Sequence, residues 1–151
     1  METFIDRLHD ELKTDEGCKY VTYLDHLGLL TGGIGHLIKG TDEEFNKPIG
    51  TSIAGNRVME WFEQDIKITI DDCRKVYDDW DYMNEEVRLI CCNMMFNLGY
   101  PRYSKFKKMI QAVKDGDHLE AGNQMKDSRW HKQVTNRADR LISRMRAVGL
   151  S

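Results

Sequence analysis

Two carboxylates and a threonine are closely spaced near the amino-terminal end of the chain. Asp25 follows Glu16 by nine residues, and Thr31 follows Asp25 by six. A carboxylic acid that protonates a leaving oxygen and a carboxylate that activates water or attacks a sugar are the minimum equipment for glycoside hydrolysis. Charged residues make up 31% of the chain, however. On these residues alone, solvated surface carboxylates are therefore the better interpretation.

The segment before Glu16 predicts a helix over residues 3–14. Its apolar residues recur at helical spacing on one face: Phe4, Ile5, Leu8 and Leu12. Gly17 is a natural stop, because glycine accepts the left-handed backbone that follows many helices. Glu16 would then lie at or just past the last turn, where the negative end of the helix dipole disfavours its charged form.

The segment from residue 19 to residue 38 predicts two or three short antiparallel strands joined by tight turns. Asp25 would end the first strand near solvent, and Thr31 would begin the second. A sheet of this size must pack on helices, since it cannot stand alone. Glu16, Asp25 and Thr31 can then converge on one cleft between helix and sheet.

The remainder of the chain predicts mostly helix, so the expected fold class is α+β with helices dominating. A polar connection over 40–53 precedes a long helix over about 54–78. Four further helices follow, around 87–98, 106–113, 118–126 and 134–145. The long helix could connect a small sheet-bearing lobe to a helical lobe.

Composition limits the possible classes of protein. Hydrophobic residues make up 40% of the chain, enough for a core. The first thirteen residues carry six charges, and no stretch resembles a signal peptide or a membrane span. We therefore expect synthesis in a cytoplasm and reduced cysteines, with Cys91 in the core. Residues 1–101 hold 10 Lys/Arg and 20 Asp/Glu, whereas residues 102–151 hold 12 and 5, so the basic last third could attract a polyanion.

The wider pattern around the carboxylates closely resembles the lysozymes of T-even bacteriophages, in glycoside hydrolase family 24. The motifs that carry the resemblance are Asp15-Glu16-Gly17, Tyr23-x-Asp25 and Thr31-x-Gly33-x-Gly35-His36-Leu37. It continues along nearly the whole chain through Phe62-x-Gln64-Asp65, Asn93-Met94-x-Phe96 with Gly99, Ser128-Arg129-Trp130 and Asn136-Arg137-Ala138-x-Arg140. The resemblance implies one domain with a two-lobed lysozyme-like fold. The sheet-bearing lobe would span about 13–60, the helical lobe about 1–12 and 80–151, and the long helix would join them.

The resemblance also implies an activity and its residues. The expected reaction is hydrolysis of the β-1,4 bond between N-acetylmuramic acid and N-acetylglucosamine in peptidoglycan, with inversion. Glu16 would be the general acid, Asp25 the base that activates water, and Thr31 the residue that positions that water. We expect no metal or cofactor and a monomer that acts in the periplasm of its host after a separate holin-type protein opens the membrane.

Further residues take expected roles from the same resemblance. Arg137 would approach the catalytic glutamate, and His36 and Asp65 would form a structural ion pair between the sheet and the long helix. Four residues would line the substrate cleft: Leu37, Phe96, Met109 and Gln124. Leu37 and Phe96 fit core packing equally well, and packing is also the preferred interpretation of Trp130.

Two other functions are compatible with the sequence. The chain could be a relative that binds peptidoglycan without cleaving it, although all three expected catalytic positions are intact. It could also be a nucleic-acid-binding helical protein that uses the basic residues of its last helix: Arg137, Arg140, Arg144 and Arg146. That helix lacks a helix-turn-helix partner and an aromatic platform beyond Trp130, so a solvated basic face is the commoner explanation.

Overall fold

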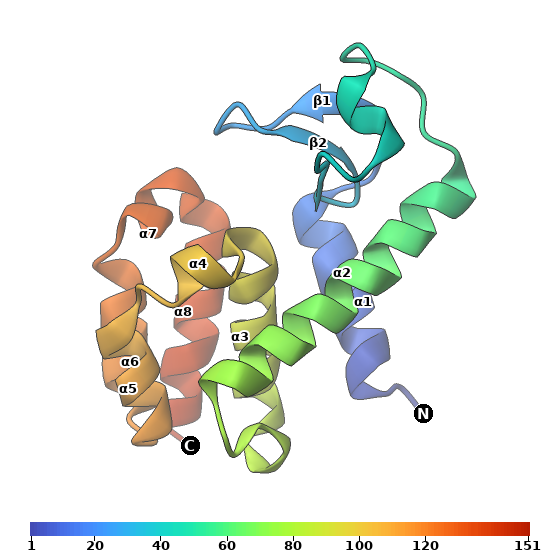
Figure 1. The fold of residues 1–151 in the computed structure, drawn as a ribbon. Coiled ribbons are helices and arrows are strands. Elements are labelled where there is room, and N and C mark those ends of the chain that lie inside the picture. Colours follow the sequence, from blue (N-terminus) through green and yellow to red (C-terminus); the bar gives the residue numbers. More distant parts are fainter. The chain divides into compact units, whose positions relative to one another are not determined.

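A computed structural model describes residues 1–151 as an α+β protein with one three-stranded sheet and eight α-helices (Figure 1). The predicted fold class is confirmed. In chain order the elements are α1 (Phe4–Glu16), β1 (Lys19–Leu24), β2 (Leu30–Gly33), β3 (His36–Leu37), η1 (Glu43–Asn46), α2 (Gly55–Val76), η2 (Trp80–Tyr82), α3 (Glu85–Leu98), α4 (Tyr100–Tyr103), α5 (Lys107–Lys114), α6 (His118–Lys126), α7 (Arg129–Gln133) and α8 (Thr135–Gly149).

The chain divides into two units, residues 1–68 and residues 69–151. Helix α2 crosses the boundary and contributes to both. Helix α1 belongs to the first unit, whereas the sequence analysis places residues 1–12 with the helical lobe. No helix is long and apolar enough to cross a membrane.

Helix α1 has a well-defined beginning and end. Thr3 caps it by accepting a hydrogen bond from the Asp6 amide, and the Asp6 carboxylate accepts one from the Thr3 amide, both at 3.1 Å. At the other end, Gly17 has a φ of +71° and its amide donates to the Lys13 carbonyl. The helix therefore stops with Glu16 as its last residue, next to the start of β1.

The sheet of the first unit is antiparallel, in the order β1-β2-β3. Tyr23 pairs with Thr31 across β1 and β2, and Thr31 pairs with Leu37 across β2 and β3. The outer edge of β1 is covered by residues 50–53, because the Thr22 amide donates to Thr51 and the Ile53 amide to Tyr20. Covering this edge removes a surface on which other chains could add strands.

The core of the first unit forms where the β2–β3 hairpin meets the beginning of α2. Val58, Trp61 and Phe62 are each 1% exposed. A Cβ on Gly32 would lie 3.5 Å from Trp61, and one on Gly33 would lie 3.2 Å from Val58. Gly33 therefore lets the backbone of β2 approach α2 closely, whereas a Cβ at Gly32 would collide first with the Ile53 side chain.

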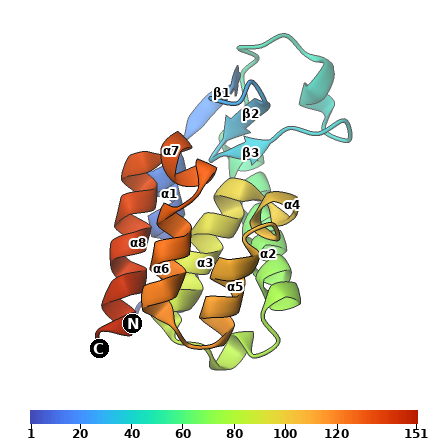
Figure 2. The same ribbon diagram turned by 90° about the vertical axis from the view of Figure 1, so that its left-hand side faces the viewer.

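The second unit is a bundle of helices around α3. Helix α6 packs against α5 and α8, and α3 packs against α8, as Figure 2 shows. Nine residues of α3 are buried: Val87, Leu89, Ile90, Cys91, Cys92, Asn93, Met94, Met95 and Leu98. Cys91 lies in this core as predicted, and burial raises the pKa of its thiol to about 12.

The core of the second unit contains a hydrogen-bonded pair of tyrosines. The hydroxyl oxygens of Tyr77 and Tyr103 lie 2.7 Å apart, and neither residue is exposed. The sulfur of Cys91 lies 4.0 Å from the Tyr77 hydroxyl. Burial is the main cause that raises the pKa of both tyrosines, so both stay protonated.

This pair predicts non-additive changes in stability. We expect Tyr77→Phe and Tyr103→Phe each to lower the free energy of unfolding by about 1–2 kcal/mol, because each leaves the other buried hydroxyl with fewer partners. The double variant should lose less unfolding free energy than the sum of the two single losses, since it leaves no unpaired hydroxyl in the core. Urea unfolding of the four proteins tests this; additive losses would contradict a shared hydrogen bond.

Candidate active site

Glu16 is placed by the end of α1 and by the hairpin that faces it. The residue is half-buried. Its carboxyl group lies against the turn between β2 and β3, where a side-chain carbon on Gly35 would lie 2.8 Å from Cδ of Glu16. The predicted position at the helix end is therefore correct, and the sheet lies beside it.

Asp25 closes the turn that joins β1 to β2. Its Oδ1 accepts hydrogen bonds from the amides of Leu27 and Leu29, both at 2.9 Å. Its own amide donates to the Leu29 carbonyl at the same distance. Two N–H donors stabilise negative charge on a carboxylate and fix its orientation. Oδ2 accepts no hydrogen bond from the protein and can take part in chemistry.

Thr31 lies on β2 and is 5% exposed. Its hydroxyl donates to the Leu29 carbonyl at 2.9 Å. Since a hydroxyl has one proton and two lone pairs, the remaining capacity of Oγ1 is to accept hydrogen bonds. The Thr31 hydroxyl can thus accept a hydrogen bond from a water molecule.

Tyr23, part of the Tyr23-x-Asp25 motif but given no role by the sequence, lies near the expected catalytic residues. It is the cross-strand partner of Thr31, so their side chains share one face of the sheet. Burial, the charge of Glu16 and the charge of Asp25, in that order, raise the pKa of Tyr23. Both carboxylates therefore lie within electrostatic reach of one phenol. The ammonium nitrogen of Lys19 lies over the Tyr23 ring, 4.1 Å from the ring centroid.

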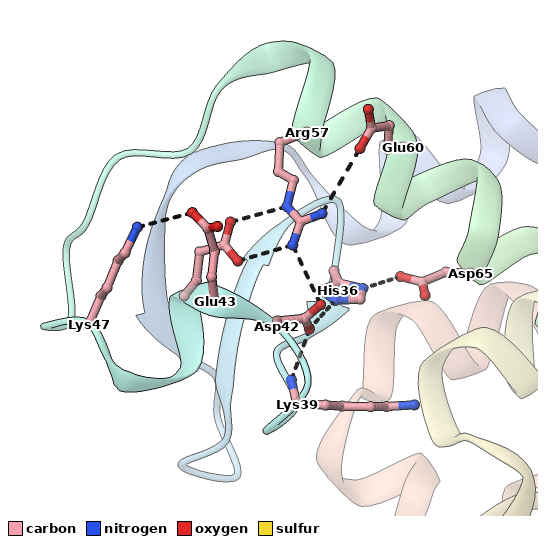
Figure 3. Close-up of polar contacts among 9 residues, drawn as sticks. His36, Lys39, Asp42, Glu43, Lys47, Arg57, Glu60 and Asp65 are labelled. Atoms are coloured by element: carbon pink, nitrogen blue, oxygen red, sulfur yellow. Dashed lines mark hydrogen bonds and ion pairs between the residues drawn. The ribbon is translucent and has the colours of Figure 1, made fainter.

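The hairpin is tied to α2 through His36, whose ring lies between two carboxylates (Figure 3). Its Nδ1 lies 2.6 Å from Oδ2 of Asp65, which is the ion pair expected from the sequence. Its Nε2 lies 3.0 Å from Oδ2 of Asp42, a partner that the sequence analysis missed. The ring also stacks on Trp61 with centroids 4.2 Å apart. Because both ring nitrogens face acceptors, both must donate, and the imidazolium form fits the site.

A second cation extends this cluster. Arg57 donates from Nε and Nη2 to the two carboxylate oxygens of Glu44, at 3.1 and 3.2 Å, and its guanidinium lies 3.6 Å from Asp42 (Figure 3). It also lies over the Trp61 ring at 4.8 Å. The paired hydrogen bonds anchor η1, and with it the 40–53 connection, to the first turn of α2.

Opposing effects act on the pKa of His36. Burial alone would lower its pKa, but the hydrogen bonds and charges of Asp65 and Asp42 together outweigh burial and raise it. For Asp42, burial opposes the Lys39 amide, His36 and Arg57, which together lower its pKa. The His36 contribution to stability is therefore complete below its unfolded pKa, near 6.5, and fades as pH rises through the folded value. The Asp42 contribution is present above about pH 4 and fades as pH falls.

The other predicted site residues lie on both units. Leu37, on β3, is 45% exposed. Phe96 and Gln124 are half-buried, and the Gln124 amide donates to Glu120. Met109 is 1% exposed, so its side chain offers no surface to a ligand. The roles of the first three in substrate binding stay predictions.

Arg137 and Trp130 are both held inside the second unit. Arg137 is buried and donates from Nε to the Asn93 side chain at 2.8 Å. Its expected approach to Glu16 stays a prediction. Trp130 is 3% exposed, donates to Asn97 at 2.7 Å and meets Phe106 edge-on, in agreement with a packing role. No cluster of three or more His, Cys, Asp or Glu residues could hold a metal ion.

The comparisons with known proteins agree with this architecture. The model of the phage lysozyme family matches residues 13–147, which include the helix end, the hairpin and the helical unit. The chain therefore belongs to the phage lysozyme family.

Three relatives show how the family's chains vary in length. The chain is 28% identical to "Probable T4-type lysozyme 2" of Dictyostelium discoideum, over 92% of this chain and 93% of that protein. It is 30% identical to the "Pre-baseplate central spike protein Gp5" of Enterobacteria phage T4, over 86% of this chain and 26% of that protein. It is 28% identical to the "Peptidoglycan hydrolase gp36" of Pseudomonas phage phiKMV, over 89% of this chain and 14% of that protein. The two phage proteins thus match this chain over a small part of their length.

The two carboxylates around His36 predict a pH-dependent loss of stability. We expect Asp42→Asn to lower the pKa of His36 and to cost about 1–2 kcal/mol of unfolding free energy near pH 5.5, where both charges are present. The cost should shrink toward pH 9, as the pH rises through the raised pKa of His36. Proton NMR titration of the His36 ring and urea unfolding at both pH values measure these effects.

Asp81→Asn is the matched control, because the Arg74–Asp81 pair is mostly exposed. Its effect should be small and the same at both pH values. Asp65→Asn should lower the His36 pKa as well. We call the cluster of His36 with Asp42 and Asp65 the charged clamp. An unchanged His36 titration in both the Asp42 and Asp65 variants would contradict these two ion pairs.

Proposed function

We propose that this protein is a lysozyme that hydrolyses the β-1,4 bond between N-acetylmuramic acid and N-acetylglucosamine in peptidoglycan. The observation that carries the proposal is that the Glu16 carboxyl lies against the β2–β3 turn, in the same small sheet that bears Thr31 on β2 and Asp25 in the β1–β2 turn. Membership of the phage lysozyme family supports the substrate, as do relatives named as lysozymes and as a peptidoglycan hydrolase.

Glu16 is the general acid in this proposal. Its protonated carboxyl gives a proton to the glycosidic oxygen while the bond from that oxygen to the anomeric carbon breaks. As the last residue of α1, Glu16 holds its carboxyl beside the β2–β3 turn of the sheet. After the step Glu16 is ionised and recovers its proton from solvent.

Asp25 and Thr31 prepare the water that completes the reaction. The water oxygen attacks the anomeric carbon from the face opposite the leaving group, and its proton passes to Oδ2 of Asp25. Oδ1 of Asp25 is held by two amides, so the oxygen left over is the one that can act as the base. Thr31 accepts the second water proton in a hydrogen bond, because its own proton is donated to Leu29. Attack from the opposite face inverts the anomeric centre.

Clearing of a Gram-negative peptidoglycan suspension by wild type and by Glu16→Gln tests the acid assignment. Wild type should clear the suspension, and Glu16→Gln should lose nearly all activity while keeping its fold, because glutamine has no proton to give. Equal clearing by both proteins would show that Glu16 is misassigned. If wild type binds the wall without clearing it, the protein is a binding relative and not an enzyme.

Replacements of Thr31 test the proposed hydrogen bond to water. Thr31→Ser keeps the hydroxyl and should keep most activity. Thr31→Val has nearly the same shape but no oxygen, and should lower kcat by about 100–1000-fold, the range of a lost transition-state hydrogen bond. In wild type, NMR identification of the product anomer in the first minutes of reaction tests whether the anomeric centre is inverted. Equal kcat for the serine and valine variants would remove Thr31 from the mechanism.

A further inference from the structure

The turn between β2 and β3 has an unusually close neighbour. Ile34 and Gly35 form the turn, and Gly35 has a φ of +62°. A Cβ at position 35 would lie 2.8 Å from Cδ and 3.1 Å from Cγ of Glu16, and closer still to its Oε1. The carboxyl group of Glu16 therefore occupies the space in which a side chain at position 35 would stand.

Among the glycines with positive φ, a nearby carboxyl group is found only at Gly35. Four of the others have nothing within 4 Å of the same position: Gly17, Gly28, Gly50 and Gly116. Gly33 faces apolar side chains of α2, and Gly99 faces only a proline at 3.9 Å. Turn geometry explains a glycine at each of these positions, whereas at Gly35 the lack of a side chain also makes room for a carboxyl group.

The turn is held firmly enough to act as a support. Ile34 is 2% exposed and fixes one side of the turn in the core. His36, the next residue after Gly35, is tied to Asp65 and Asp42. The backbone at Gly35 therefore has little freedom to move away from Glu16.

From this geometry, and resting on the function proposed above, we infer that Gly35 is a positioning residue for the general acid. Because Gly35 has no side chain, the Glu16 carboxyl can lie directly against the β2–β3 turn. This contact sets the distance between that carboxyl and Thr31, which lies on the same hairpin as Gly35. Any side chain at position 35 must push that carboxyl out of its position. Proton transfer in a glycosidase depends steeply on this placement, since a displacement of about 1 Å can cost about 100-fold in rate.

The test compares three variants by kcat and KM on a soluble peptidoglycan oligosaccharide. Gly35→Ala should lower kcat by about 10–100-fold, change KM less than about threefold and shift the alkaline limb of the pH–rate profile. Gly50→Ala is the control for backbone strain, because φ at Gly50 is +92° and the position is open. It should lower the Tm but keep kcat and the pH profile.

Gly35→Asn separates crowding from strain. Asparagine tolerates positive φ better than alanine, but its side chain is larger. If crowding of Glu16 matters, the asparagine variant should be no less stable than the alanine variant and no more active. If strain alone matters, asparagine should be the more active of the two, and that order would overturn the proposal.

A readout that needs no activity keeps this inference separate from the proposed function. The carboxyl ¹³C resonance of Glu16, assigned by its loss in Glu16→Gln, should titrate differently in Gly35→Ala and as in wild type in Gly50→Ala. An unchanged titration in Gly35→Ala would overturn the positioning role. If wild type cleaves no peptidoglycan, the proposed function fails, while this measurement still decides whether Gly35 places the carboxyl.

Discussion

The first unit depends on the charged clamp around His36. A three-stranded sheet whose last strand has two residues cannot hold its own shape, so it has to be fastened to a helix. His36 does this from β3, with Asp65 of α2 at 2.6 Å on one side and Asp42 of the following connection at 3.0 Å on the other. Trp61 of α2 lies flat against the ring. One side chain thus fixes hairpin, helix and connection together, and the positions of Thr31 and of the turn beside Glu16 follow from it.

The segment that carries the proposed chemistry has a backbone that few residues can adopt. Four of the seven glycines with positive φ lie between the end of α1 and β3: Gly17, Gly28, Gly33 and Gly35. Each tight turn brings a functional group to a place that regular helix or strand would not reach, at some cost in backbone freedom on folding. At Gly33 and Gly35, the apolar contacts of Trp61 and the ion pairs of the adjoining His36 offset that cost.

The sequence predicts the parts of this architecture that depend on local pattern. Hydrophobic periodicity predicts α1, α2, α5 and α8, and the family resemblance predicts His36 with Asp65. Asp42 could not be predicted, because it lies in a polar connection whose path depends on Arg57 and Glu44. Tyr23 belongs to the Tyr23-x-Asp25 motif, but only the folded hairpin shows that it pairs with Thr31, because the register of β1 shifts between Lys19 and Tyr23. The short helix α4 follows Gly99 and contains Pro101, residues that normally stop a helix, so local signals argue against it.

The charge asymmetry of the chain acquires a different meaning in the folded second unit. The basic last third suggested attraction to a polyanion, yet several arginines of α8 are engaged inside the unit. Arg144 pairs with Glu86 at 2.9 Å, and Arg146 donates to Asn123. Buried Arg137 donates to Asn93 of α3. Two of these contacts join α8 to α3, and the Arg144 pair joins the basic third to the acidic first two thirds. Part of the asymmetry therefore serves helix packing, which leaves fewer cations for a nucleic acid than the sequence alone suggests.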